Sequence, residues 1–366
     1  MIGRSSGTGL FALFGLVLGV VLGIVIMSPV PAFADPAGPT DYRTEVVSIE
    51  PASPNIDVQI LGGDAFVEVT AEPGTDVVVM GYGGEPYLWF QPDGAVLENQ
   101  NSPATAMNTS RDGAMPAGAH EASADAEPDW KQIASDHRWA WHDHRAHWMQ
   151  ATRPTGASPG DQILEGVIPL EVDGTAVEVS VVSRWEPAPS ALPMWLGGLF
   201  GLLCAVAAFV CRRRRYPTTP WMVPPAVLAL VAGLWQYLSL PAATAPPTVW
   251  WLLPAIAVTC ALGGLLAEFA RARFWADAAM LVVGVELAVW GWIKRDGLSA
   301  ALIPSGAPGW LDRFAVSSAL VGGVAFAVLA LWFLFGTGQR RTTDGEFAEL
   351  VSASRAAKGS RHPAHP

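Results

Sequence analysis

Residues 193–211, PMWLGGLFGLLCAVAAFVC, decide the fold, because this stretch carries no charged side chain and is long enough to cross a membrane. A helix rises about 1.5 Å per residue, so roughly 20 apolar residues span a hydrocarbon core of about 30 Å. Four later stretches are similarly long and apolar, at residues 221–240, 248–268, 274–293 and 314–336. The sequence therefore predicts an α-helical bundle of five transmembrane helices within residues 191–337.

The composition of the whole chain agrees with a membrane protein. Of its 366 residues, 51% are hydrophobic and 15% are charged, whereas charged residues make up about 25% of soluble globular domains. The chain has 22 Lys and Arg against 33 Asp and Glu, a formal net charge of −11. Nucleic-acid binding depends on basic side chains that neutralise phosphates, so we expect no nucleic-acid partner.

The N-terminal end has the layout of a secretory signal peptide over residues 1–34. Arg4 precedes an apolar run, and Ala32-Phe33-Ala34 has the small residues of a cleavage site. A retained membrane anchor is the alternative, because glycines at every fourth residue of the run would form a helix-packing face. We expect residues 35–190, in which acidic side chains far outnumber basic ones, to form an exported domain.

Basic clusters follow the first, third and fifth predicted spans. They are residues 212–215, then Arg271 and Arg273, then Arg340 and Arg341. Cytoplasmic loops of membrane proteins carry an excess of such residues. The pattern predicts a multi-pass protein of the cell membrane with its N-terminal domain extracytoplasmic. Residues 338–366, rich in Ser, Ala and Gly, are predicted to form a disordered cytoplasmic tail.

Residues 35–190 have the pattern of an all-β domain. Short β-branched runs recur, separated by turn signals such as Gly62-Gly63 and Asp173-Gly174. The runs are residues 44–49, 57–61, 65–70, 76–80, 87–90, 166–170 and 176–183. Many short strands of this spacing predict an immunoglobulin-like sandwich. The three cysteines, Cys204, Cys211 and Cys260, fall in the apolar half, so no disulfide framework is expected in the β domain.

The most unusual stretch is residues 137–149, HRWAWHDHRAHWM, which holds four of the seven histidines. If it is extended, His142 and His144 share one face and form a usable metal chelate. If it is helical, His144 and His147 are neighbours instead. Imidazole suits late first-row metals, among which copper(II) binds most tightly, and a thioether suits copper(I). Copper is the predicted cofactor, and the candidate ligands are His142, His144, His147, His137 and Met149, with His120 in the long loop as an additional one.

Two other hypotheses fit the same residues. In the first, Arg138 and Arg145 form ion pairs with acidic neighbours, and the tryptophans pack in the core or rest on the membrane surface. The protein is then a non-catalytic envelope scaffold or protein-interaction module. In the second, clustered histidines that titrate near neutral pH act as a pH sensor. Stoichiometric metal uptake distinguishes the metal hypothesis from the scaffold.

The predicted spans contain no histidine, and Glu286 is the carboxylate nearest the middle of a span. Acidic residues inside a membrane mark functional or interhelical sites. Cys204 and Cys260 are expected to pack between helices as small hydrophobic side chains. The sequence has no nucleophile elbow, phosphate loop, dinucleotide fingerprint, HExxH or CxxC motif. We therefore expect no enzyme activity, no catalytic residue and no nucleotide partner.

Residues 141–149, together with residues 62–66 and 84–87, resemble a family of uncharacterised bacterial membrane proteins with an exported β domain followed by a multi-span region. The resemblance covers nearly the whole chain and implies architecture without an activity. The plan also looks like a CopC-type copper carrier fused to a CopD-type membrane partner. The chain departs from that plan because residues 35–37 and the spans contain no histidine. The partners implied are the lipid bilayer and, for a scaffold, another envelope protein.

Overall fold

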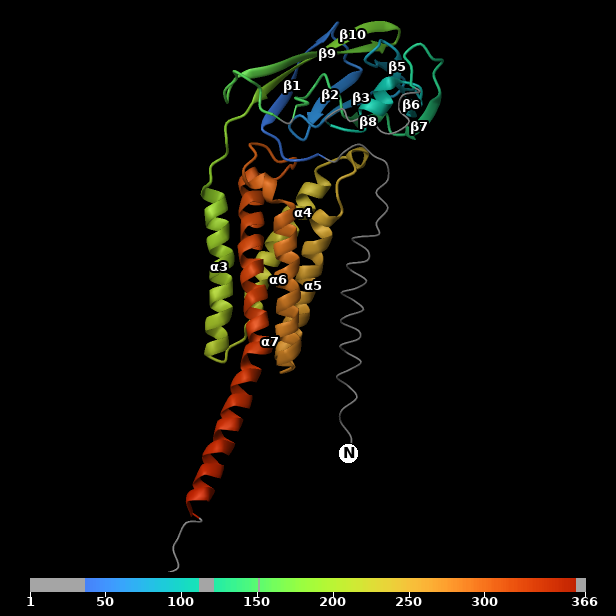
Figure 1. Cartoon of the computed structure of the whole chain (residues 1–366). Helices are drawn as coiled ribbons and strands as arrows, with labels where there is room; N and C mark the ends of the chain where they lie inside the picture. The colour runs from blue at the N-terminus through green and yellow to red at the C-terminus, as the bar shows by residue number, and fades with distance from the viewer. Residues whose placement is uncertain (1–36, 112–121, 151, 360–366) are drawn as a thin grey trace, which may run out of the picture. The chain divides into compact units, whose positions relative to one another are not determined.

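The computed structural model describes residues 37–111, 122–150 and 152–359 and divides into two units, a β domain and a helical region (Figure 1). The predicted signal peptide or anchor at residues 1–34 and the candidate ligand His120 lie outside the described residues.

The β domain contains two antiparallel sheets. A seven-stranded sheet has the order β1-β10-β9-β4-β5-β6-β7, and a three-stranded sheet has the order β2-β3-β8. The strands are β1 (Tyr42–Glu50), β2 (Ile56–Leu61), β3 (Phe66–Ala71), β4 (Val77–Met80), β5 (Pro86–Phe90), β6 (Val96–Asn99), β7 (Trp130–Ala134), β8 (Arg138–Trp141), β9 (Gln162–Val172) and β10 (Thr175–Trp185).

All seven strand runs predicted from the sequence are strands in the structure, and three further strands were missed. The missed strands are β6, β7 and β8. Each has at most one β-branched residue and no strict alternation of apolar and polar residues, so the sequence pattern does not mark it as a strand. The predicted long loop after β6 also contains a short helix, α2 (Pro103–Met107), which begins where the Ser102 hydroxyl accepts a hydrogen bond from the backbone N–H of Ala104.

Both sheets contribute side chains to one hydrophobic core. Val67 and Val69 come from β3, and Val79, Leu88 and Val179 come from strands of the larger sheet. In β10, buried valines at 177, 179 and 181 alternate with more exposed neighbours, which confirms the core-facing side predicted for this strand.

The helical region contains five helices long and apolar enough to cross a membrane, which fits a multi-pass membrane protein. The spans are α3 (Leu192–Arg213), the η2–α4 helix (Thr219–Leu238, with η2 at Thr219–Met222 and α4 at Val223–Leu238), α5 (Val249–Phe269), α6 (Arg273–Ile293) and residues Gly309–Phe335 of α7. Their bounds lie close to the predicted ones. Two short turns, η3 (Ala242–Thr244) and η4 (Arg295–Leu298), lie in the connections.

Glycines let α7 pack closely against α3 and α6. A Cβ atom at Gly201 of α3 would lie 2.3 Å from the carbonyl oxygen of Ser318, and one at Gly284 of α6 would lie 2.5 Å from the backbone nitrogen of Ala327. Such close backbone approach is typical of helix contacts in membranes, and it agrees with the packing role expected for glycines in the first and fifth spans.

Helix α7 extends from Gly309 to Gly359. The backbone of residues 338–359 is therefore helical, which differs from the disorder predicted for residues 338–366. This segment contains Ala, Glu, Leu and Lys, which favour a helix and allow α7 to continue beyond its apolar part. Residues 360–366 lie outside the described residues.

Candidate functional site

The histidine segment, residues 137–149, is a strand only as far as Trp141. Strand β8 pairs with β3, and residues 142–149 then form neither strand nor helix. Asp143 makes the turn, because its Oδ1 accepts a hydrogen bond from the backbone N–H of Arg145 at 3.0 Å and its carbonyl oxygen accepts from that of Ala146 at 2.9 Å. Aspartate favours such turns over regular structure. Residues 142–149 thus follow neither the extended nor the helical backbone considered from the sequence, although His144 and His147 are neighbours, as the helical alternative expected.

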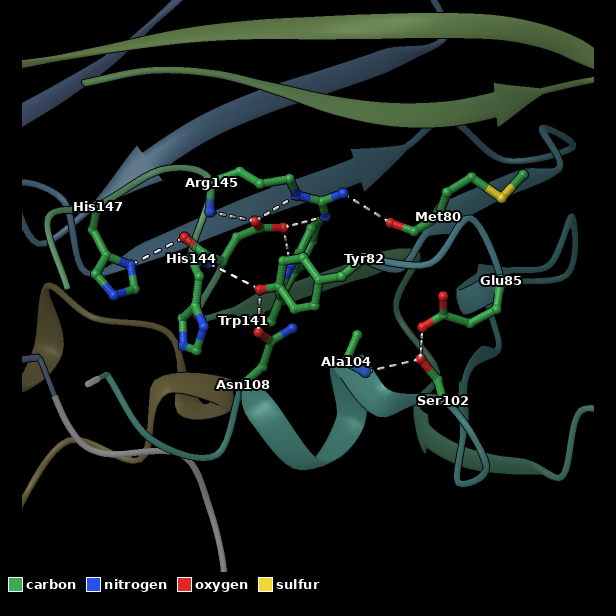
Figure 2. Close-up of polar contacts among 11 residues, drawn as sticks. Met80, Tyr82, Glu85, Ser102, Ala104, Asn108, Trp141, His144, Arg145 and His147 are labelled. Carbon is green, nitrogen blue, oxygen red and sulfur yellow. Dashed lines mark hydrogen bonds and ion pairs between the residues drawn. The ribbon is translucent and has the colours of Figure 1, made fainter. Parts of the chain in front are cut away.

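A buried ion pair fixes this turn. The guanidinium of Arg145 donates from Nε to Asp143 Oδ1 at 2.8 Å and from Nη2 to Oδ2 at 2.7 Å, and Trp141 Nε1 donates to Oδ2 at 3.0 Å. The same guanidinium donates to the carbonyl oxygen of Met80 and lies 4.9 Å from the centre of the Tyr82 ring (Figure 2). Because Asp143 is only 1% exposed, these hydrogen bonds offset the free-energy cost of burying its negative charge.

Tyr82 links the turn to the segment after α2. Its hydroxyl donates to Asn108 Oδ1 at 2.5 Å and accepts from the backbone N–H of His144 at 2.9 Å (Figure 2). Burial, followed by the negative charge of Asp143, raises the pKa of Tyr82 well above its ordinary value. The phenol therefore keeps its proton and acts as a hydrogen-bond donor.

The imidazoles of His142 and His144 each contact a backbone carbonyl from a distant part of the chain. His142 Nδ1 lies 2.5 Å from the carbonyl oxygen of Ala65, and its ring stacks on Phe66 with centroids 4.2 Å apart. His144 Nε2 lies 3.0 Å from the carbonyl oxygen of Ser110. Both side chains are buried.

His147 lies between the other two imidazoles. Its ring centroid is 5.3 Å from that of His144 and 6.1 Å from that of His142. Its Nε2 lies 2.6 Å from the carbonyl oxygen of Arg111, and its Nδ1 lies 3.0 Å from that of Asp143. The three imidazoles thus connect residues 65, 110 and 111 to one turn, and we call His142, His144 and His147 the histidine clamp.

Burial sets the charge of His147. It lowers the pKa of His147 to about 4, and the positive charge of Arg111 lowers it further, although the contact with the Arg111 carbonyl acts in the opposite direction. His147 is therefore neutral near pH 7. A neutral imidazole has one N–H, so only one of its two carbonyl contacts is a hydrogen bond at a time.

The remaining candidate ligands lie apart or partly exposed. His137 precedes β8 at the end opposite to His142, and its ring lies against Gly94. Met149 is 36% exposed. Within the described part of the chain, no group of three or more His, Cys, Asp or Glu side chains is arranged to hold a metal ion. Nδ1 of His144 is buried without a hydrogen-bond partner.

Sequence reasoning missed Glu85, which supports the start of α2, and Gly166, which lies against the turn. Glu85 is buried and accepts hydrogen bonds from the Ser102 hydroxyl at 2.6 Å and from the Gly83 N–H at 2.9 Å. Gly166 of β9 lies directly against the turn, since a Cβ there would be 2.1 Å from the carbonyl oxygen of Arg145. No local pattern marks these residues, because each acts on a partner distant in the sequence.

Ion pairs expected from the structural hypothesis are present. Arg145 pairs with Asp143, and Arg138 pairs with Glu68 at 2.7 Å. In the helical region Glu286 of α6 is 7% exposed, and Cys204 and Cys260 are free thiols.

Comparison of the chain with protein-family models, with curated proteins and with solved structures gives no match. The fold defines a class, a chain with an antiparallel β region followed by five helices able to cross a membrane. The family resemblance stated from the sequence stays a prediction.

Proposed function

We propose that this chain is an integral protein of the cell membrane whose exported β domain is a non-catalytic interaction module for another envelope protein. The helical bundle anchors it in the lipid bilayer. One observation carries the proposal: each imidazole of the histidine clamp contacts a backbone carbonyl, so the most chemically distinctive residues of the chain hold loops together.

The polar network around the clamp supports a rigid presentation surface. Two sets of hydrogen bonds meet in this buried site: Arg145 donates to Asp143, and Tyr82 donates to Asn108 and accepts from the backbone N–H of His144. Buried hydrogen bonds strengthen one another in the low dielectric of the interior and favour one packing, although Asn108 Nδ2 and His144 Nδ1 have no partner there. We further propose that the two sheets, which share one core, form a sandwich of the immunoglobulin-like class.

The proposed orientation follows from the arginine clusters after the first, third and fifth spans. It places the β domain and residues 35–190 outside the membrane, and the C-terminal tail in the cytoplasm. A signal peptide over residues 1–34 is the proposed route of export.

Copper binding by the histidine clamp is the competing hypothesis. In its favour, the ring centroid of His147 lies 6.1 Å from that of His142 and 5.3 Å from that of His144, and His144 Nδ1 has no hydrogen-bond partner. Against it, a metal needs an imidazole lone pair, and both nitrogens of His147 face carbonyl oxygens. Metal binding would therefore require these contacts to be released.

Titration of Cu(II), then Zn(II), into the purified full-length protein in neutral detergent separates the two hypotheses. We expect no saturable uptake at one equivalent, and we expect His142→Ala with His144→Ala to destabilise the β domain, because Ala65 and Ser110 lose their donors. His137→Asn, at a histidine outside the clamp, is the matched control. Sub-micromolar uptake of one equivalent that a folded double variant loses would replace our proposal with a metal site.

The interaction itself is tested in intact cells with a photo-crosslinking amino acid at Val47 or Val167, which are exposed on the β domain. We expect a discrete crosslinked species from at least one position, and none from the buried position Val79. Crosslinks to lipid alone at both exposed positions would contradict the module.

A further inference from the structure

The two ends of the helical region differ in whether their basic side chains have partners within the chain. At the end where α3 and α5 finish and α6 begins, five exposed arginines have no ion pair with any side chain described up to residue 335, although Arg213 lies over the rings of Phe209 and Trp332 at 5.2 and 5.9 Å. They are Arg213, Arg214, Arg215, Arg271 and Arg273, and we call them the arginine surface.

The carboxylates at this end accept hydrogen bonds from groups outside the arginine surface. Asp277 accepts from Arg212 at 2.6 Å. Glu268 accepts hydrogen bonds from the backbone N–H groups of Thr218 and Thr219, the latter at 2.9 Å, and from both threonine hydroxyls. These contacts also bring the end of α5 beside the start of η2, so Arg271 and Arg215 belong to the same end of the bundle. Among the described side chains at this end, the two carboxylates Asp277 and Glu268 face six arginines, so the arginine surface keeps a net positive charge.

The cations at the opposite end have internal partners. Lys294 forms a buried ion pair with Asp312. Arg313 donates to the carbonyl oxygens of Ala300 and Ala301 at 2.7 and 2.9 Å. Arg295 donates to the carbonyl oxygen of Trp292 at 2.8 Å and lies 3.7 Å from Asp296. The unpaired positive charge is thus concentrated at one end.

Two arginines of the surface also occupy backbone conformations that favour glycine. Arg215 has φ of 64° and Arg271 has φ of 59°, each just after a helix. Glycine is the usual residue at such a position, because a Cβ atom is strained there. An arginine at both positions indicates that its side chain contributes something that a glycine would not. Exposed aromatic residues, Tyr216 and Phe269, lie beside them, as is typical of a membrane interface.

We propose that the arginine surface binds the phosphate headgroups of anionic phospholipids. The guanidinium group donates in a planar fork that matches a phosphate. Its position at the ends of apolar helices places it at the depth of the headgroups. Attraction to an anionic membrane surface amounts to about fivefold in affinity per basic residue. The proposal depends on the membrane location and is independent of the role of the β domain.

The test compares phosphatidylglycerol with phosphatidylcholine of the same acyl chains, each titrated into the full-length protein in neutral detergent and counted by native mass spectrometry. The wild type should retain phosphatidylglycerol preferentially. Arg271→Gln with Arg273→Gln should reduce this preference roughly 25-fold, whereas Arg271→Lys with Arg273→Lys should keep most of it. Arg295→Gln, at the opposite end, is the matched control and should behave as the wild type.

Equal retention of the two lipids by the wild type would overturn the proposal. So would an equal loss in Arg295→Gln, or displacement of the lipid by inorganic phosphate at millimolar concentration, which would indicate a soluble-anion site. If the glutamine variant fails to fold by circular dichroism, the wild type is measured between 50 mM and 500 mM salt. The preference should fall steeply, because salt screens exposed charges, and a preference unchanged by salt would also overturn the proposal.

Discussion

Lowering the pH from 7 to 5 should destabilise the β domain by about 2 kcal/mol through His147 alone. Burial lowers the pKa of this imidazole from 6.5 to about 4 in the folded protein. As the pH falls through 6.5, His147 takes up a proton in the unfolded chain but stays neutral in the folded chain. Stability from this residue is therefore complete above pH 6.5 and is lost progressively as the pH falls toward 4.

The full effect follows from the two pKa values. Each tenfold difference in proton affinity corresponds to about 1.4 kcal/mol, so the whole difference amounts to about 3 kcal/mol below pH 4. His147 is 1% exposed, so solvent screening reduces this little.

Glu98 acts in the opposite direction. Burial raises the pKa of this carboxyl, so acidification relieves the penalty of its buried charge. The contribution of His147 is therefore measured as the difference between the wild type and His147→Gln, in which an amide N–H replaces the imidazole and does not titrate. Glu98 is present in both proteins, and its effect cancels in the difference.

The assay is pulse proteolysis of the full-length protein in neutral detergent across a urea series at pH 7, 6 and 5, which reports the unfolding midpoint of the β domain. The wild-type midpoint should fall with pH more steeply than that of His147→Gln. Parallel pH profiles for the two proteins would refute the reasoning, because they would show that His147 takes up its proton equally well in the folded state.

Three further substitutions test the packing of the site and of the helical region. Asp143→Asn should destabilise the β domain by about 3 kcal/mol, because it leaves the Arg145 guanidinium buried without a counter-charge, whereas Glu186→Gln in the exposed pair with Arg43 should cost less than about 0.5 kcal/mol in the same urea series. Gly166→Ala should cost roughly 3 kcal/mol, because its Cβ would lie 2.1 Å from the Arg145 carbonyl oxygen, and Gly38→Ala, with nothing within 4 Å of the new atom, should be neutral. Arg271→Gly should raise the thermal stability of the helical region by about 1 kcal/mol by removing left-handed strain, and Arg271→Ala, which keeps the strain, should give no such gain. An Asp143→Asn protein as stable as the Glu186→Gln control would contradict the buried ion pair.

The sequence by itself determined the elements whose signal is local. Five apolar stretches sufficed for the five helices, because crossing a membrane requires about 20 consecutive apolar residues. Seven strands followed from alternation and turn residues, since the two-residue period and the glycines at turns such as Gly174 are properties of neighbouring positions. The strands β6 to β8 lack that signal, because each has at most one β-branched residue and no strict alternation.

Only the tertiary structure decided what the histidine segment does. The imidazoles of His142, His144 and His147 contact the carbonyl oxygens of residues 65, 110 and 111. Gly166 of β9 lies against the same turn. These partners lie far along the chain from the histidine segment, so sequence spacing alone placed His142 and His144 on one face of a strand that in fact ends at Trp141. The physical reason is that a turn made by Asp143 side-chain hydrogen bonds overrides the local preference for an extended chain. Its stability comes from the buried partners that folding brings to it.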